Sequence, residues 1–375
     1  MNPIPFNKPY LTGKETLYIE DAVKTGKISG NGKYTQLCQQ WFEDTYGFKK
    51  VLLTTSCTDA LEMCALLANI QEGDEVIVPS FTFVSTAIAF IRQGAKIVFV
   101  DSCNDNPNMD VSKIETLITA KTKAIVPVHY AGVACDMDKI MELAATYNLL
   151  VIEDAAQAID SYYTGKDGIK RALGSIGHLA AFSFHETKNI ISGEGGMLTI
   201  NDNRFVQRAE IIWEKGTNRA EFFRGEVNKY GWVDIGSSFL PSEVIAAFLW
   251  AQIENIEGIQ NKRKKLWQTY YDAIFERNNE GIQLPELPTY ATNNGHMFYL
   301  VLESIEHRTA LIEKLKENGF HAVFHYLSLH ASDYYKSKHD GRVLPNSDKF
   351  SNCLVRLPLF YELSEESIVN LIKTI

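Results

Sequence analysis

The sequence lacks the features of several protein classes. None of its six cysteines stands in a Cys-x-x-Cys pair, which argues against a disulfide framework or a zinc site. No run of about 18 apolar residues occurs, and residues 1–10 hold no apolar core of a signal peptide. Positive charge is scarce, since 37 Lys and Arg against 46 Asp and Glu give a net charge of −9. We therefore expect a cytoplasmic protein with no metal, no membrane and no nucleic acid as partner.

Apolar residues are plentiful, and their arrangement predicts a large α/β domain. Hydrophobic residues make up 45% of the 375-residue chain, enough for a sizeable core. Short apolar runs alternate with segments of helical length, a pattern typical of strands buried on both faces of a mostly parallel sheet. We expect one or two of these strands to run antiparallel. The expected strands are 51–54, 75–78, 96–100, 124–128, 149–153, 179–183 and 197–200, and the helices between them include 58–69, 84–93, 111–118 and 136–147.

Two further helices are expected before this rhythm, at 15–24 and 35–46, and a smaller α+β domain after it. A long amphipathic helix, 242–270, is predicted to break near Gly258. The smaller domain then contains a strand at 297–302, a helix at 308–318 and a strand at 353–357. The length suits two units, which we place at 1–240 (the large domain) and 241–375.

Three polar residues follow the ends of predicted strands, where ligands bind in such sheets. Asp154 ends one strand, Lys188 follows a later one, and Thr58 begins the helix after the first. Each has a simpler interpretation: Asp154 or Thr58 as a helix cap, and Lys188 as a solvated surface charge. Together they suit pyridoxal phosphate, which needs an amine for a Schiff base, an acid at its ring nitrogen and a cradle for its phosphate.

Several segments carry a resemblance to a known family. They include Ile-Glu-Asp-Ala-Ala-Gln-Ala at 152–158 and Ser-Phe-His-Glu-Thr-Lys-Asn at 183–189, with 55–61, 73–83 and 127–132. On these the chain resembles the sugar aminotransferases of the DegT/DnrJ/EryC1/StrS family, which have the fold-type I pyridoxal-phosphate architecture. Segments 214–219, 222–225 and 232–238 resemble the dTDP-4-amino-4,6-dideoxygalactose transaminase branch, whose product serves enterobacterial common antigen and the O-antigens of lipopolysaccharide.

The resemblance implies roles for the cofactor-binding residues. Lys188 is the Schiff-base lysine and moves the proton, Asp154 pairs with the pyridinium nitrogen, and Gln157 lies near the phenolic oxygen. Phe83 stacks on the ring, although plain core packing is its alternative. The phosphate is held by Ser183, Thr58 and the amide of Asp59. Ser238 stands where many relatives carry an Asn that reaches the partner subunit's phosphate, so its hydroxyl replaces that contact or the contact is absent.

The resemblance also implies the substrates. Glutamate donates the amino group and dTDP-4-dehydro-6-deoxyglucose accepts it, at active sites shared within a homodimer. The candidate sugar-nucleotide contacts are His129, Tyr130, His185, Lys215, Arg219, Arg224, His325 and Tyr326. Arg suits a diphosphate, but each Arg is also a candidate surface charge, and His325 a candidate structural residue.

Three rival functions stay open at this point. A sugar dehydratase of the same fold would carry His in place of Lys188. An aminotransferase acting at C3, or on a UDP-linked sugar, would keep the same cofactor site. A regulator or scaffold would have no need to retain Lys188, Asp154 and Ser183 together.

Overall fold

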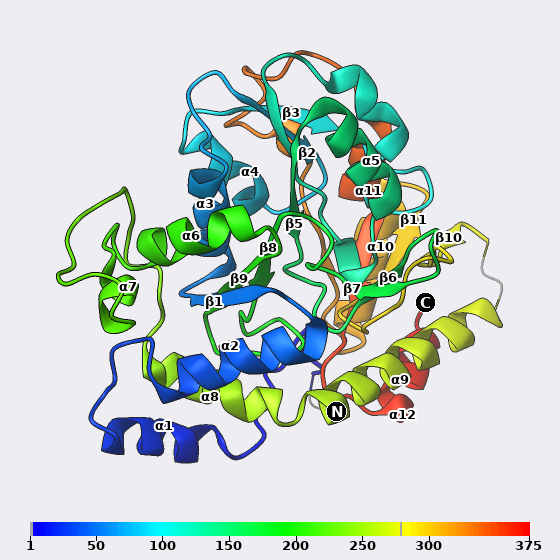
Figure 1. The fold of residues 1–375 in the computed structure, drawn as a ribbon. Helices are drawn as coiled ribbons and strands as arrows, with labels where there is room; N and C mark the ends of the chain where they lie inside the picture. Colours follow the sequence, from blue (N-terminus) through cyan, green and yellow to red (C-terminus); the bar gives the residue numbers. More distant parts are fainter. Residues whose placement is uncertain (1–2, 278–279) are drawn as a thin grey trace.

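The computed structural model describes residues 3–277 and 280–375, and its centre is a seven-stranded sheet (Figure 1). The strand order is β1-β9-β8-β5-β4-β2-β3, and β9 alone runs antiparallel to its neighbours. This confirms the predicted seven-stranded, mostly parallel sheet. The strands are β1 (Lys50–Thr54), β2 (Glu75–Pro79), β3 (Lys96–Val100), β4 (Thr122–Ile125), β5 (Leu150–Asp154), β8 (Leu179–Ser183) and β9 (Gly196–Ile200).

Helices cover both faces of the sheet because successive strand residues point to opposite sides. In β2, Ile77 joins one apolar cluster while Val76 and Val78 join the other. The first cluster packs under α2 (Lys33–Tyr46), α5 (Met137–Tyr147) and α8 (Glu243–Ile253). The second packs under α3 (Cys57–Leu67), α4 (Val84–Ile91) and α6 (Val206–Trp213), which lie together on the left of the sheet in Figure 1.

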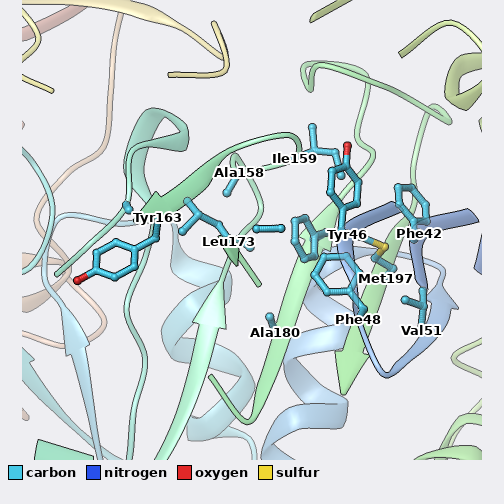
Figure 2. Close-up of a cluster of buried hydrophobic side chains, with 14 of the residues drawn as sticks. Phe42, Tyr46, Phe48, Val51, Ala158, Ile159, Tyr163, Leu173, Ala180 and Met197 are labelled. Atoms are coloured by element: carbon cyan, nitrogen blue, oxygen red, sulfur yellow. The ribbon is translucent and has the colours of Figure 1, made fainter. Parts of the chain in front are cut away.

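A cluster of aromatic side chains packs α2 against the sheet. Figure 2 shows Phe42 and Tyr46 of α2 beside Phe48, with Val51 and Met197 from the strands next to them. The rings of Phe42 and Phe184 stack with centroids 5.5 Å apart. Phe184 directly follows β8, so this packing helps to fix the segment that carries Lys188.

A second sheet lies in the later part of the chain, in the order β10-β11-β13-β12. Its strands are β10 (Ile282–Gln283), β11 (Phe298–Leu302), β12 (Val323–Phe324) and β13 (Leu354–Leu357), accompanied by α9 (Ile256–Phe275), α10 (Ile305–Glu317), α11 (Pro345–Cys353) and α12 (Glu365–Ile372). The division into 1–240 and 241–375 stays a prediction, and residues 1–2 and 278–279 of those units lie outside the described part. Helix α8 packs against α1 (Glu15–Lys24) and α2.

Three local expectations need correction. The long helix breaks at Glu254–Asn255 and not at Gly258, which lies inside α9. The segment 111–118 forms two 3-10 turns in place of one helix. A small hairpin, β6 (Tyr162–Thr164) and β7 (Lys170–Ala172), was not expected. No helix in the described ranges is long and apolar enough to cross a bilayer.

Candidate active site

A cavity of about 530 Å³ opens where the carboxyl ends of β1, β2, β5 and β8 meet, and the second sheet contributes its other wall. This is the edge at which ligands bind in sheets of this kind. The predicted residues that line the cavity are Thr58, Phe83, Asp154, Gln157, Ser183, His185, Lys188, His325 and Tyr326.

Asp154 ends β5 and its side chain is buried in the cavity wall, with 5% exposure. No helix begins after it, so the helix-cap interpretation is excluded. Its Oδ2 accepts a hydrogen bond from Thr86 Oγ1 at 2.7 Å, and its Oδ1 accepts one from Ala156 N at 3.2 Å. Burial raises the pKa of this carboxyl, while the hydrogen bond from Thr86 opposes the rise. A cationic ring nitrogen beside Asp154 would favour its charged form.

Lys188 stands on a turn that follows β8, and its side chain is half-buried against the cavity. Its backbone N–H donates to the carbonyl of His185 at 2.9 Å, and His185 N–H donates to Ser183 Oγ at 3.3 Å. These bonds fold the turn so that Ser183, His185 and Lys188 all face the cavity. Burial lowers the pKa of the Lys188 amine, and the nearby carboxyl of Asp154 partly opposes this effect. A neutral amine is therefore more accessible here than on a surface lysine.

The start of α3 forms a possible phosphate cradle. Ser56, and not Thr58, is the residue that caps this helix, because Ser56 Oγ accepts from Asp59 N at 3.1 Å. Thr58 Oγ1 instead faces the cavity and shares a 2.7 Å hydrogen bond with Ser85 Oγ. The Asp59 carboxylate turns toward Thr55 Oγ1, and Asp59 is not a cavity residue. Gly196 allows the close packing here, since a Cβ there would meet Cys57 N at 2.5 Å.

Aromatic side chains form one wall of the cavity. Phe83 is 55% exposed, so the alternative of plain core packing is wrong. Its ring lies 5.9 Å from that of Tyr326, whose hydroxyl accepts from Gln157 Nε2 at 3.2 Å. Gln157 Oε1 in turn accepts from Ala131 N at 2.6 Å. Burial lowers the pKa of His325 well below its ordinary value, so this ring is neutral at neutral pH.

His129 and Tyr130 do not reach the cavity, which corrects their prediction as sugar contacts. His129 is 0% exposed, and its ring nitrogens bond Glu153 Oε2 at 2.9 Å and Cys135 N at 3.2 Å. Tyr130 is 2% exposed, and its hydroxyl bonds His325 Nδ1 at 2.9 Å. Tyr130 therefore supports the cavity residue His325, whereas His129 is part of the core behind it.

The predicted residues of the 214–240 segment also lie outside this cavity. Arg224 pairs with Glu210 and Glu226 at 2.8 Å each, and these contacts raise the pKa of its guanidinium. Arg219 lies 3.8 Å from Glu214, and Lys215 and Ser238 are likewise absent from the cavity wall. Figure 1 shows this segment, with α7 (Arg219–Phe223), projecting at the side of the molecule.

Several cavity residues were not anticipated from the sequence, among them Thr86, His296 and Arg356. Arg356 lies on β13, and among the described residues no carboxylate pairs with it and its buried Nε has no hydrogen-bond partner. Burial lowers the pKa of its guanidinium. The available signal was a charged residue inside the apolar run Leu354–Leu357. Such a cation suits a planar anion.

The cavity residues fit pyridoxal phosphate by their chemistry. The set combines one amine, one buried carboxylate that lacks an ion-pair partner among the described residues, and the hydroxyls of Thr58 and Ser183 beside a helix start. Lys188 would hold the aldehyde carbon, Asp154 the ring nitrogen, and the hydroxyls the phosphate.

Comparison with known proteins agrees with this fit. The sequence model of the DegT/DnrJ/EryC1/StrS aminotransferase family matches residues 9–375. GDP-perosamine synthase of Escherichia coli O157:H7 is 32% identical over 376 residues, covering 100% of this chain and 98% of that protein. The PLP form of a putative sugar aminotransferase from Streptococcus pneumoniae has a TM-score of 0.88 at 26% identity, covering 99% of this chain and 97% of that one. DesV of S. venezuelae has a TM-score of 0.90 at 27% identity, with 100% and 98% coverage.

Proposed function

The chain belongs to the DegT/DnrJ/EryC1/StrS aminotransferase family, and we propose that it transfers the amino group of L-glutamate to C4 of dTDP-4-dehydro-6-deoxyglucose. The products are 2-oxoglutarate and dTDP-4-amino-4,6-dideoxygalactose. The coarser function is established by the family: the chain is a pyridoxal-phosphate-dependent sugar aminotransferase. The observation that carries the chemistry is the presence of Lys188 and Asp154 in one cavity at the carboxyl edge of the sheet.

Pyridoxal phosphate, when bound, supplies the electron sink that makes the α-proton of an amino acid removable. In the first half-reaction Lys188 Nζ takes the proton from the α-carbon of glutamate, and in the second it delivers one to C4 of the sugar. A general base works best with a pKa near the working pH. Burial of Lys188 lowers its pKa in that direction. Asp154 would hold the ring nitrogen of that group in its charged form.

Arg356 supports a donor with a carboxylate. Its guanidinium faces the same cavity as Lys188 and has unfilled hydrogen-bonding capacity among the described residues. A bidentate pair with the glutamate carboxylate would satisfy it. We assign His185, His325 and Tyr326, which share this cavity, to the sugar that replaces glutamate in the second half-reaction.

The proposal includes a homodimer in which segment 214–240 of one protomer approaches the partner's cavity. In support, this segment exposes Trp232 at 85%, Ile235 at 56% and Val233 at 55%, and neighbouring exposed apolar side chains are typical of a protein–protein contact. Lys215, Arg219, Arg224 and Ser238 would then act on the partner's ligands. Sedimentation equilibrium tests the dimer, and a monomer at working concentration would refute it.

The substrate is tested by product analysis. The purified protein is incubated with glutamate and dTDP-4-dehydro-6-deoxyglucose, and the product is examined by NMR for an axial amine at C4. Matched reactions use GDP- and UDP-linked 4-keto sugars and a 3-keto sugar. The GDP-linked acceptor is included because a relative 32% identical is named GDP-perosamine synthase. An equatorial amine, a C3 amine, or faster turnover of another nucleotide would reject the proposed acceptor.

A further inference from the structure

The segment 3–10 lies against the cavity and links the stretch after α10 to the turn that carries Lys188. Ile4 pairs with the stretch after α10, since its N–H donates to Gly319 O at 2.8 Å and its carbonyl accepts from His321 N at 3.0 Å. Asn7 Nδ2 donates to the carbonyl of Glu186 at 3.2 Å, on the turn that presents Lys188. Phe6 and Asn7 themselves line the cavity.

Phe6 covers the guanidinium of Arg356. The guanidinium carbon lies 4.5 Å from the centre of the Phe6 ring, the shortest of the Arg–aromatic contacts in the described residues. A ring over one face of a guanidinium attracts the cation and leaves the N–H edges for a ligand. Arg356 has no carboxylate partner among the described residues, and its Nη2 makes only a long 3.4 Å contact with Phe324 O. Phe6 is therefore the main side chain that orients this cation.

We propose that Phe6 is a positioning residue that selects a carboxylate-bearing amino donor, by holding the edge of the Arg356 guanidinium toward the cavity. This inference rests on the proposed transamination and deepens it. Asn7 fastens the segment to the Glu186 carbonyl, so the residue that orients the donor is tied to the turn that carries Lys188. A keto sugar has no carboxylate, and the contribution of Phe6 accordingly falls on the donor half-reaction.

The test compares Phe6→Leu, which keeps apolar volume but removes the ring, with Phe6→Tyr, which keeps the ring. Phe205→Leu is the matched control, because Arg204 lies 5.6 Å above the Phe205 ring outside the cavity. Two quantities are measured on the cofactor-loaded protein: the dissociation constant of glutarate, an unreactive dicarboxylate, by calorimetry, and the single-turnover rate of each half-reaction by absorbance.

Phe6→Leu should weaken the binding of glutarate and glutamate about five- to tenfold, the loss expected of a partly buried cation–π contact. The rate at saturating glutamate and the half-reaction with the keto sugar should each stay within about twofold of wild type. Phe6→Tyr and Phe205→Leu should bind glutarate like wild type. The inference would be overturned if Phe6→Leu slowed both half-reactions equally, or if Phe6→Tyr bound glutarate as weakly as Phe6→Leu. It would also be overturned if the wild-type protein did not bind glutarate.

Failure of the proposed acceptor is distinguishable from failure of this inference. The glutarate and glutamate measurements require no sugar nucleotide, so a wrong sugar leaves the comparison of Phe6 variants intact. A correct acceptor with unchanged glutarate binding in Phe6→Leu would refute the role of Phe6 alone.

Discussion

Replacing Asp154 by Asn removes one charge from the cavity while nearly preserving shape. The carboxylate is 5% exposed and, within the described part of the chain, accepts two hydrogen bonds, from Thr86 Oγ1 and Ala156 N. An Asn carbonyl oxygen keeps one of these bonds, and the Thr86 hydroxyl can rotate to accept from the new amide. The fold should therefore survive the substitution, and its consequences should come from the lost charge.

Turnover should fall about 10- to 10³-fold. A charge-assisted hydrogen bond contributes roughly 1.5–3 kcal/mol, and about 1.4 kcal/mol corresponds to a factor of ten. Loss of a preorganised electrostatic partner in a water-poor site typically costs about 10²–10³ in kcat. Single-turnover conversion with glutamate measures the effect directly, without any assumption about the sugar.

The same substitution should affect the stability of the cofactor-free protein in the opposite direction. Burial raises the pKa of Asp154 in the folded state. Its protonated form therefore favours folding below the ordinary Asp pKa, and this contribution is lost as the pH rises through the raised value. Asn does not titrate. The variant should thus gain stability relative to wild type as the pH rises above the ordinary Asp pKa of about 4, and the gain should level off above the raised value, measured by urea unfolding.

Asp160→Asn is the control for both measurements. Asp160 pairs with Lys264 at 2.7 Å outside the cavity, and its φ of 56° suits Asn. This variant should turn over like wild type. The reasoning is refuted if Asp154→Asn keeps full turnover, or if the cofactor-free variant is less stable than wild type at neutral pH.

Three further substitutions distinguish the residue that takes part in the reaction from residues that hold the cofactor site or the fold in place. Lys188→Ala should abolish turnover and prevent borohydride from fixing the cofactor to the chain, as mass spectrometry would detect; a variant that still transaminates would exclude Lys188 as the catalytic amine. Thr86→Val removes the 2.7 Å donor to Asp154 and should weaken cofactor binding about tenfold in a fluorescence titration, since a bond to a charged group contributes roughly 1.5–3 kcal/mol; unchanged affinity would contradict this. His129→Ala should cost about 1.5–3 kcal/mol in urea unfolding because it removes the buried hydrogen bond to the Glu153 carboxylate, which keeps three backbone N–H donors, while turnover per folded molecule stays near wild type; a selective loss of sugar binding would restore His129 as a substrate contact.

The main sheet was predictable because its signal is local. Each strand is a short apolar run, and Lys96–Val100 and Leu179–Ser183 match their expected bounds. One or two antiparallel strands were expected, but the sequence did not show that β9 would be one of them, since strand order depends on contacts between distant residues. The predicted position of the helix break, Gly258, was wrong because a single glycine does not end a helix when neighbouring turns pack well; the break lies at Glu254–Asn255.

Site residues at strand ends were predictable for the same reason, whereas those delivered by distant elements were not. Asp154 and Lys188 follow strands whose carboxyl ends share one edge, and both face the cavity. Phe6 and Arg356 come from opposite ends of the chain, and only the packing of the second sheet brings them together. His129 shows the reverse error: the resemblance implied a sugar contact, but Glu153 and Cys135 hold this side chain inside the core.

The cavity contains two charged side chains, Asp154 and Arg356, whose partial or full burial lowers the stability of the fold. Asp154 and Arg356 each lack an ion-pair partner among the described residues, although burial of an uncompensated charge is unfavourable. They line the same cavity as Lys188, yet neither pairs with the other. A cofactor with a cationic ring and a donor with a carboxylate would satisfy one charge each. The two side chains thus offer the two electrostatic contacts that transamination requires, which is the expected exception to internal consistency at a functional site.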